Sequence, residues 1–115
     1  MKTLSMTRNN DFLRAYRRGK SVSDPCVVCY VMPNRLSVTR LGLTTSKKIG
    51  NAVARNRARR VLRAAYREIA PQILPGYDIV LVARTKTTIT KSTALTPILT
   101  AQLRKLGALQ SKEKE

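Results

Sequence analysis

The sequence has no histidine, no tryptophan and only six carboxylates. Histidine is the common general base and metal ligand near neutral pH, so its absence excludes histidine-activated nucleophiles and histidine-bound metals. The carboxylates are scattered along the chain, which argues against catalysis by a pair of carboxylates. We therefore predict no catalytic residue and no metal ligand in the protein itself.

Long apolar runs are also absent. No stretch of about 18 apolar residues occurs, so we expect no membrane span and no membrane partner. The first residues, Met1 to Met6, have no apolar run behind them and do not resemble a signal peptide. We expect the protein to act in the cytoplasm.

The two cysteines, Cys26 and Cys29, are spaced as Cys-Val-Val-Cys. A structural zinc site needs four ligands, and the sequence offers neither a second cysteine pair nor a histidine. A redox pair normally begins a helix, whereas these residues stand in a β-type run. We interpret both cysteines as small apolar side chains of a sheet.

What the sequence has in excess is positive charge. Lysine and arginine number 23 against 6 acidic residues, which gives a formal net charge of +17 over 115 residues. The length predicts a single domain over residues 1–115, and 43% hydrophobic residues are enough for a folded core. A compact fold with this charge repels itself, which indicates an anionic partner. Nucleic acid is the first candidate and an anionic membrane surface the second.

Periodicity predicts six elements in the order α-β-β-α-β-α. The predicted helices span residues 8–18, 51–70 and 94–106, and the predicted strands span 26–32, 41–45 and 77–83. Pro97 is compatible with the last helix only in its first turn. We expect a central sheet of three to four strands covered by helices, with residues 1–7 and 108–115 frayed.

The helix predicted over residues 51–70 has two contrasting faces at about 100° per residue. One face is apolar, with Ala54, Ala58, Val61, Leu62, Ala65 and Ile69. The opposite face carries Asn56, Arg59, Arg60, Arg63 and Arg67, with Arg55 and Arg57 on the flanks. A charged face is often simply solvated, but solvated helices mix signs because like charges four residues apart are destabilising. Phosphate groups would reverse that repulsion, so we interpret this face as a nucleic-acid contact.

The segment from Ser46 to Arg63 contains Arg55-Asn56-Arg57 and resembles the signature of the bacterial ribonuclease P protein subunit family. An Asn-Asp-Phe near the first helix, an Arg-Arg-Gly-Lys-Ser after it and a Tyr-Asp-Ile-Val strand are similar to the same family. The resemblance extends over roughly residues 5–107.

This resemblance implies a small α/β (α+β), ribosomal-protein-like fold with a left-handed β-α-β crossover. It also implies a function. In that family the catalyst is a large RNA, which uses Mg²⁺ to remove the 5′ leader from precursor tRNA. The protein would bind the catalytic RNA in a 1:1 complex, together with precursor tRNA, and would not catalyse the cleavage alone.

The resemblance further implies two sets of binding residues. The residues expected to contact the catalytic RNA are Lys47, Lys48, Asn51, Arg55, Asn56, Arg57, Arg59, Arg60, Arg63 and Arg67. The residues expected to line a leader-binding cleft are Phe12, Tyr16, Tyr30, Arg14, Arg17, Arg18 and Lys20. Phe12 and Tyr16 share a helix face, and aromatic rings can stack on unpaired bases. Helical spacing alone favours core packing for these two rings, and the resemblance is what favours the cleft.

Two features depart from the family pattern. Residues Leu4 to Arg8 contain few basic side chains, and Val27 stands where the family often has an aromatic, which predicts weaker base stacking near the first strand.

Three other functions compete with the one that the resemblance implies. A ribosomal or other structural RNA-binding protein would have the same composition. A protein nuclease would need its carboxylates gathered around Mg²⁺, but Asp11, Asp24, Glu68 and Asp78 fall in different predicted elements. A chaperone or a DNA-compacting protein would not explain the paired aromatic residues.

Overall fold

A computed structural model describes residues 3–110. Its five strands form one mixed sheet in the order β1-β4-β5-β3-β2. The strands are β1 (Thr3–Ser5), β2 (Lys20–Asp24), β3 (Val27–Pro33), β4 (Thr39–Thr44) and β5 (Tyr77–Ala83). The helices are α1 (Asn9–Arg18), α2 (Ala52–Ile69) and α3 (Ser92–Lys105), with short 3₁₀ turns η1 (Lys47–Ile49), η2 (Ala70–Gln72) and η3 (Thr85–Ile89).

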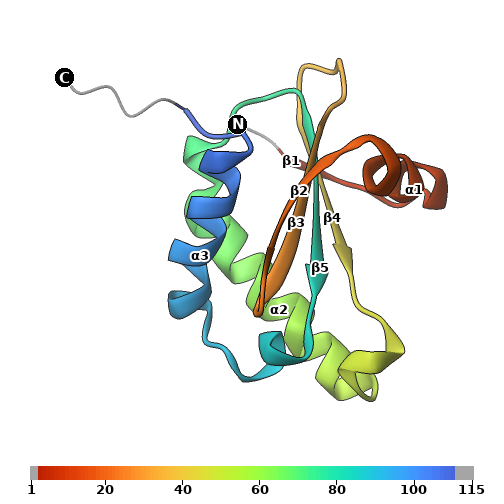
Figure 1. The fold of residues 1–115 in the computed structure, drawn as a ribbon, viewed down its shortest axis with the longest axis vertical. Helices are drawn as coiled ribbons and strands as arrows, with labels where there is room; N and C mark the ends of the chain where they lie inside the picture. Colours follow the sequence, from red (N-terminus) through yellow and green to blue (C-terminus); the bar gives the residue numbers. More distant parts are fainter. Residues whose placement is uncertain (1–2, 111–115) are drawn as a thin grey trace.

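The sheet separates the helices into two unequal layers. Seen along its edge, α1 lies on one side and α2 and α3 lie on the other (Figure 1). Strands β2, β3 and β5 pair antiparallel, while β4 is parallel to β5 and β1 is parallel to β4. The predicted single α+β domain is thus confirmed. The left hand of the crossover from β4 through α2 to β5 stays a prediction.

The larger core lies between the sheet and the pair α2 and α3. Alternate residues of β3, Val27, Cys29 and Val31, point into it. The apolar stripe predicted for α2 faces the same core, with Ala58, Leu62, Ala65 and Ile69 buried and Ala54 and Val61 partly buried against it. Leu95, Leu99 and Leu103 of α3 complete the core with helical spacing.

The two cysteines are apolar fillers, as predicted. Cys29 is fully buried in the larger core, and burial raises the pKa of its thiol to about 12. Cys26 precedes β3 and is half-buried, with its Sγ 3.6 Å from the hydroxyl of Thr90. A fully buried thiol that stays protonated packs as a small apolar side chain.

The structure differs from the prediction in the two edge strands of the sheet and in the segments predicted to be frayed. Residues 3–5 and 20–24 form the edge strands β1 and β2, which the sequence analysis missed, so residues 3–5 are not frayed. Ala108 and Leu109 are buried, and Leu109 bridges Ile73, so fraying from residue 108 is also wrong. Residues 1–2 and 111–115 lie outside the described part. Both edge strands are short and polar, so they lack a hydrophobic alternation that would mark them.

Pro97 occupies the sixth position of α3 rather than its first turn, because the helix begins two residues earlier than predicted. Proline in a helix interior leaves the carbonyl four residues earlier, here that of Thr93, without its usual N–H donor. Thr93 and Pro97 are both exposed, so water can satisfy that carbonyl. The exposed location makes an interior proline tolerable here.

A smaller core holds α1 on the opposite face of the sheet. Its buried members are Met6, Ala15 and Val80. Phe12 of α1 packs over Gly42 of β4, where a Cβ atom would lie 2.6 Å from Cε1 of the Phe12 ring. Real Cβ atoms essentially never approach that closely, so the missing side chain of Gly42 is what lets α1 seat its aromatic ring.

We expect the substitution Gly42→Ala to push the Phe12 ring outward and to lower the free energy of unfolding by about 1–3 kcal/mol, as overpacking does. Urea denaturation measures this change. In a Phe12→Ala background the same substitution should cost much less, because the clashing ring is gone. An equal cost in both backgrounds would show that the strain lies elsewhere.

Candidate nucleic-acid interface

The outer face of α2 is a continuous arginine surface. Arg57, Arg60, Arg63 and Arg67 are exposed, and Asn56 lies among them. Within residues 3–110 every ion pair involves Asp11 or Asp78, and none reaches an arginine of α2. In this part of the chain no carboxylate contacts their guanidinium groups, which leaves them available to phosphate oxygens.

The turn that precedes α2 sets the direction of this surface. Gly50 has φ = 137°, a value that L side chains rarely adopt, and it separates η1 from the helix. Asn51 then caps α2, accepting a hydrogen bond of 2.9 Å from the backbone N–H of Ala54 at its Oδ1. Asn51 was predicted to contact RNA; the structure gives its carbonyl oxygen a capping role. Lys47 and Lys48 are exposed on η1 immediately before this turn.

Two further arginines of the predicted set are oriented by local hydrogen bonds. Arg55 donates from Nη1 to the carbonyl oxygen of Gly50 at 3.2 Å. Arg59 donates from Nη1 to Oδ1 of Asn56 at 3.1 Å. Both side chains are half-buried. These bonds restrict the side chains and reduce the rotamer entropy that binding would otherwise remove.

Shallow hollows lie along the arginine surface. One of about 510 Å³ is lined by Val53, Asn56, Arg59, Arg60 and Arg63. A second of about 360 Å³ has Arg57 and Arg60 on one side and Ser92 of α3 on the other. Arg60 lines both hollows, which makes it the central residue of the surface. No sequence pattern indicates Ser92 as a neighbour of this surface, because its position depends on how α3 packs against α2.

The predicted cleft aromatics do come together, between α1 and the sheet. The rings of Tyr16 and Tyr30 lie 5.1 Å apart at 69°, edge to face. The hydroxyls of Tyr16 and Thr44 are hydrogen-bonded at 2.6 Å. Phe12, Tyr16 and Tyr30 are all half-buried against the smaller core. The same rings thus pack in a core and retain an exposed part.

The basic residues predicted for the cleft are not all beside these rings. Arg14, Arg17 and Arg18 line, with Asn10, a separate hollow of about 240 Å³ on α1. Lys20 was predicted to line or flank the cleft, but it is paired with Val31, whose side chain lies in the larger core, so Lys20 leaves the sheet on the face opposite the rings.

The sheet register also reveals polar neighbours of the rings that the sequence did not suggest. Ser21 is opposite Tyr30 and Ser23 is opposite Val28, so both serines belong to the face that carries α1. The same reasoning corrects the expectation for Val27. This residue is fully buried in the larger core, so it does not face the rings, and its identity has no bearing on base stacking there.

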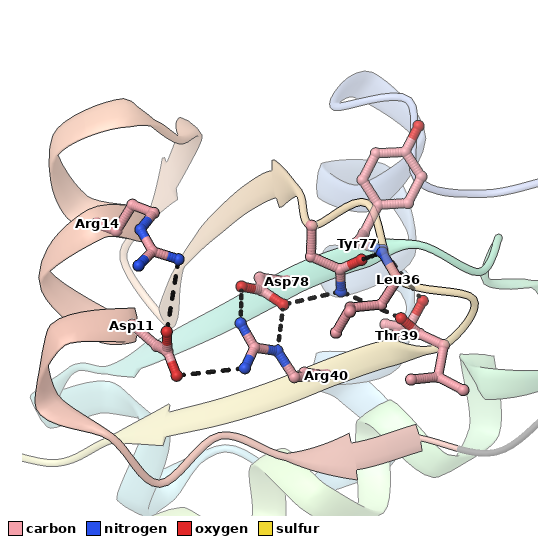
Figure 2. A network of polar contacts seen from close by, with 9 residues as sticks. Asp11, Arg14, Leu36, Thr39, Arg40, Tyr77 and Asp78 are labelled. Atoms are coloured by element: carbon pink, nitrogen blue, oxygen red, sulfur yellow. Dashed lines mark hydrogen bonds and ion pairs between the residues drawn. The ribbon is translucent and has the colours of Figure 1, made fainter.

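A buried charge network ties α1 to the sheet (Figure 2). Arg40 of β4 donates from Nε and Nη2 to the two carboxylate oxygens of Asp78, at 2.8 and 2.6 Å. Its Nη1 also donates to Oδ2 of Asp11 in α1 at 3.2 Å. Asp78 is fully buried, and its hydrogen bond is the main reason that the pKa of Arg40 is raised. Arg40 therefore fixes α1 against β4 and β5.

Asn34 extends this network into the loop between β3 and β4. Its Nδ2 donates to Oδ1 of Asp78 at 2.9 Å and to the carbonyl oxygen of Val38 at 3.1 Å. Its own Oδ1 accepts from the backbone N–H of Leu36 at 2.7 Å. The buried carboxylate thus has donors on both oxygens, which offsets its desolvation.

Two of the four carboxylates that the sequence places in different elements lie near each other in the structure. Asp11 and Asp78 converge, but on the Arg40 guanidinium, which occupies the place that a cation would take. Within the described part of the chain, no three potential metal-ligating side chains lie together. Both carboxylates are engaged in the ion pairs that join α1, β4 and β5.

We expect Asp78→Asn to lower the free energy of unfolding by about 3 kcal/mol, because it leaves Arg40 without its buried counter-charge. Asp11→Asn removes only the longer and more exposed contact and should cost about 1 kcal/mol. Urea denaturation of both variants tests this difference. Equal losses would mean that Arg40 does not depend chiefly on Asp78.

Comparison with known proteins identifies close relatives of this chain. The family model described as Ribonuclease P matches residues 1–107. The ribonuclease P protein component of Clostridioides difficile is 42% identical over 84 residues, which cover 72% of this chain and 74% of that protein. That of Caldanaerobacter subterraneus is 42% identical over 85 residues, with 74% and 73% covered.

Solved structures agree in fold. The Staphylococcus aureus RNase P protein superposes with a TM-score of 0.81 at 31% identity, covering 95% of this chain and all of that one. The RNase P protein of Thermotoga maritima gives a TM-score of 0.75 at 27% identity, covering 87% and 96%. No helix within residues 3–110 has the length and apolar character needed to cross a bilayer.

Proposed function

The chain belongs to the ribonuclease P protein family, and from this premise we propose that it binds the catalytic RNA of the holoenzyme and the 5′ leader of precursor tRNA. In this role it assists removal of the leader to give the mature 5′ end of tRNA. It acts in the cytoplasm as one protein per catalytic RNA. The RNA performs the chemistry, and the protein alone does not cleave.

The observation that carries this proposal is the arginine surface of α2. It projects like charges along several turns of one helix, with no carboxylate of residues 3–110 in ion-pair contact with them. A phosphate backbone would relieve this repulsion and release counterions on binding. Lys47, Lys48 and the arginines of α2 are the proposed contacts with the catalytic RNA.

The aromatic rings between α1 and the sheet are the proposed contact for the leader. The exposed parts of Phe12, Tyr16 and Tyr30 offer π-faces on which unpaired bases can stack at about 1–3 kcal/mol each. Stacking has little sequence preference, which suits a protein that accepts many different precursors. Arg14, Arg17 and Arg18 on α1 could attract the leader backbone from outside the ring cluster.

Mg²⁺ enters this function through the RNA. The protein's described residues offer no cluster of three metal-ligating side chains, and Asp11 and Asp78 are held by Arg40, so they do not suit a Mg²⁺ site. The proposed function therefore uses no metal held by the protein. The contribution of the protein is positive charge and positioning.

A cleavage assay tests the proposal. Precursor tRNA is incubated at low Mg²⁺ with the cognate catalytic RNA, with the protein, and with both together. We expect efficient cleavage at the mature 5′ end only in the mixture. Cleavage by the protein alone would place the active site in the protein and contradict the proposal. A mixture no better than the RNA alone would favour a ribosomal or other structural RNA-binding protein.

We expect Arg60→Ala to weaken binding of the catalytic RNA about 10-fold, because Arg60 is central to the surface and a charge-assisted hydrogen bond is lost. The plot of log affinity against log salt should become shallower by about 1. Filter binding or fluorescence titration at several salt concentrations measures both. Arg104→Ala, at an exposed position at the end of α3, is the matched control. An equal loss of affinity in that variant would mean that the net charge of the protein, and not the position of Arg60, explains the effect.

We expect Tyr16→Ala to weaken binding of precursor tRNA to the holoenzyme by about 5-fold or more while leaving mature tRNA unaffected, since only the precursor carries a leader. Tyr16→Phe removes the hydrogen bond to Thr44 but keeps the ring, so it should retain most of the affinity. Competition binding with both tRNAs compares the variants. Equal losses for precursor and mature tRNA would contradict the assignment of the leader to these rings.

A further inference from the structure

A hollow of about 320 Å³ lies between the edge strand β1 and helix α2, apart from the hollows already described. Ser5 and Leu41 line it from the sheet, and Tyr66 and Ala70 line it from α2 and the turn that follows. Arg63 and Arg67 also line it. It thus combines an apolar wall with two cationic groups, whereas the two hollows on the outer face of α2 have mainly arginine and small side chains around them.

The apolar wall is held in a fixed position. Tyr66 is only 5% exposed, and its hydroxyl is hydrogen-bonded to Oγ1 of Thr3 at 3.1 Å. Burial raises the pKa of the Tyr66 hydroxyl, so it stays neutral and can take part in this bond. The bond joins β1 to α2 between two residues that line the hollow, so a ligand would meet a preformed wall.

The sheet side of the hollow supplies polar backbone groups. Among the described residues, strand β1 pairs with β4 alone, so no strand covers its other edge. The N–H of Met6 donates to the carbonyl of Leu41, and successive residues of a strand alternate in direction, so the N–H and C=O of Ser5 point to the open side. These groups could satisfy the donors and acceptors at the edge of a planar ring.

The two arginines supply the charge. Arg63 and Arg67 are four residues apart on α2, so they repel each other on one face of the helix. Neither has a carboxylate partner within residues 3–110. A phosphate group between them would accept hydrogen bonds from both guanidinium groups.

We propose that this hollow receives one unstacked nucleotide of the bound RNA, with its phosphate at Arg63 and Arg67 and its base against Leu41 and Ala70. The proposal rests on the proposed function for the identity of the RNA. A base within a double helix has both faces covered by stacking, so the nucleotide must come from a loop, a bulge or a strand end. The site would thereby distinguish folded RNA with an extruded base from a regular duplex.

Methyl-resolved NMR of the whole protein tests the base contact directly, with adenosine 5′-monophosphate and inorganic phosphate as probes. We expect the nucleotide to shift the methyl signals of Leu41 and Ala70 and the side-chain signals of Arg63 and Arg67. Inorganic phosphate should shift only the arginine signals. If the nucleotide likewise leaves the methyl signals unmoved, the hollow binds no base and the proposal is overturned.

A substitution that fills the hollow tests its use by RNA. Ser5→Phe places a ring there from an exposed position, without removing any charge. Ser37→Phe, in the exposed loop between β3 and β4, is the matched control. We expect Ser5→Phe to abolish the nucleotide-induced methyl shifts and to weaken binding of the cognate catalytic RNA about 10-fold, with an unchanged salt dependence. Ser37→Phe should change neither.

The results separate this proposal from the function on which it rests. If the native protein binds the catalytic RNA tightly and Ser5→Phe, shown by its NMR spectrum to be folded, binds equally well, the nucleotide site is wrong and the proposed function stands. If the native protein does not bind the catalytic RNA at all, the proposed function itself fails. The experiment with adenosine 5′-monophosphate needs no variant, so a Ser5→Phe chain that does not fold would still leave the base contact tested.

Discussion

The contact between Arg40 and Asp78 is the interaction on which the arrangement of this protein depends. A carboxylate with no solvent exposure needs a cation and several hydrogen-bond donors, and Arg40 and Asn34 provide them. Because the same guanidinium also reaches Asp11, the helix α1 is held at one place on the sheet. The position of Phe12 over Gly42 and of Tyr16 beside Tyr30 follows from that attachment. The Arg40 network and the smaller core together therefore position the surface that would meet a leader.

Within residues 3–110, the paired carboxylates and the unpaired arginines lie in different parts of the structure. Among the described residues, the carboxylates in ion pairs are Asp11 and Asp78, and both are used to attach α1. No carboxylate in residues 3–110 forms an ion pair with the arginines on the exposed face of α2, so their charges are not neutralised by such contacts. Repulsion along that face is a cost to the free protein, while the larger core beneath it, with Leu62 and Ile69 from the same helix, supplies the stability that offsets this cost. Because its apolar and basic faces are separated, α2 contributes to the larger core with one face and to the arginine surface with the other.

The sequence predicts the parts of this molecule whose pattern is local. The two faces of α2, the buried strand at 77–83 and the pairing of Phe12 with Tyr16 all follow from periodicity, and the structure has them. The edge strands β1 and β2 were missed because Thr3–Ser5 and Lys20–Asp24 are short and polar. The Arg40 network joins residues far apart in the chain, and no spacing indicates it. The face to which Lys20 and Val27 point depends on the register of the sheet, which a single strand does not reveal.

The position of β5 at the centre of the sheet has a consequence for biosynthesis. This strand lies between β3 and β4, and it is made after both of them and after the whole of α2. While the chain grows, β3 and β4 have no strand between them, and the arginine helix leaves the ribosome before β5 and α3 complete the core that buries its apolar face. Folding can therefore be completed only late in translation, because the defining contacts are non-local. During that interval the exposed basic helix is surrounded by ribosomal RNA, so premature capture by the wrong RNA is a hazard that this topology creates.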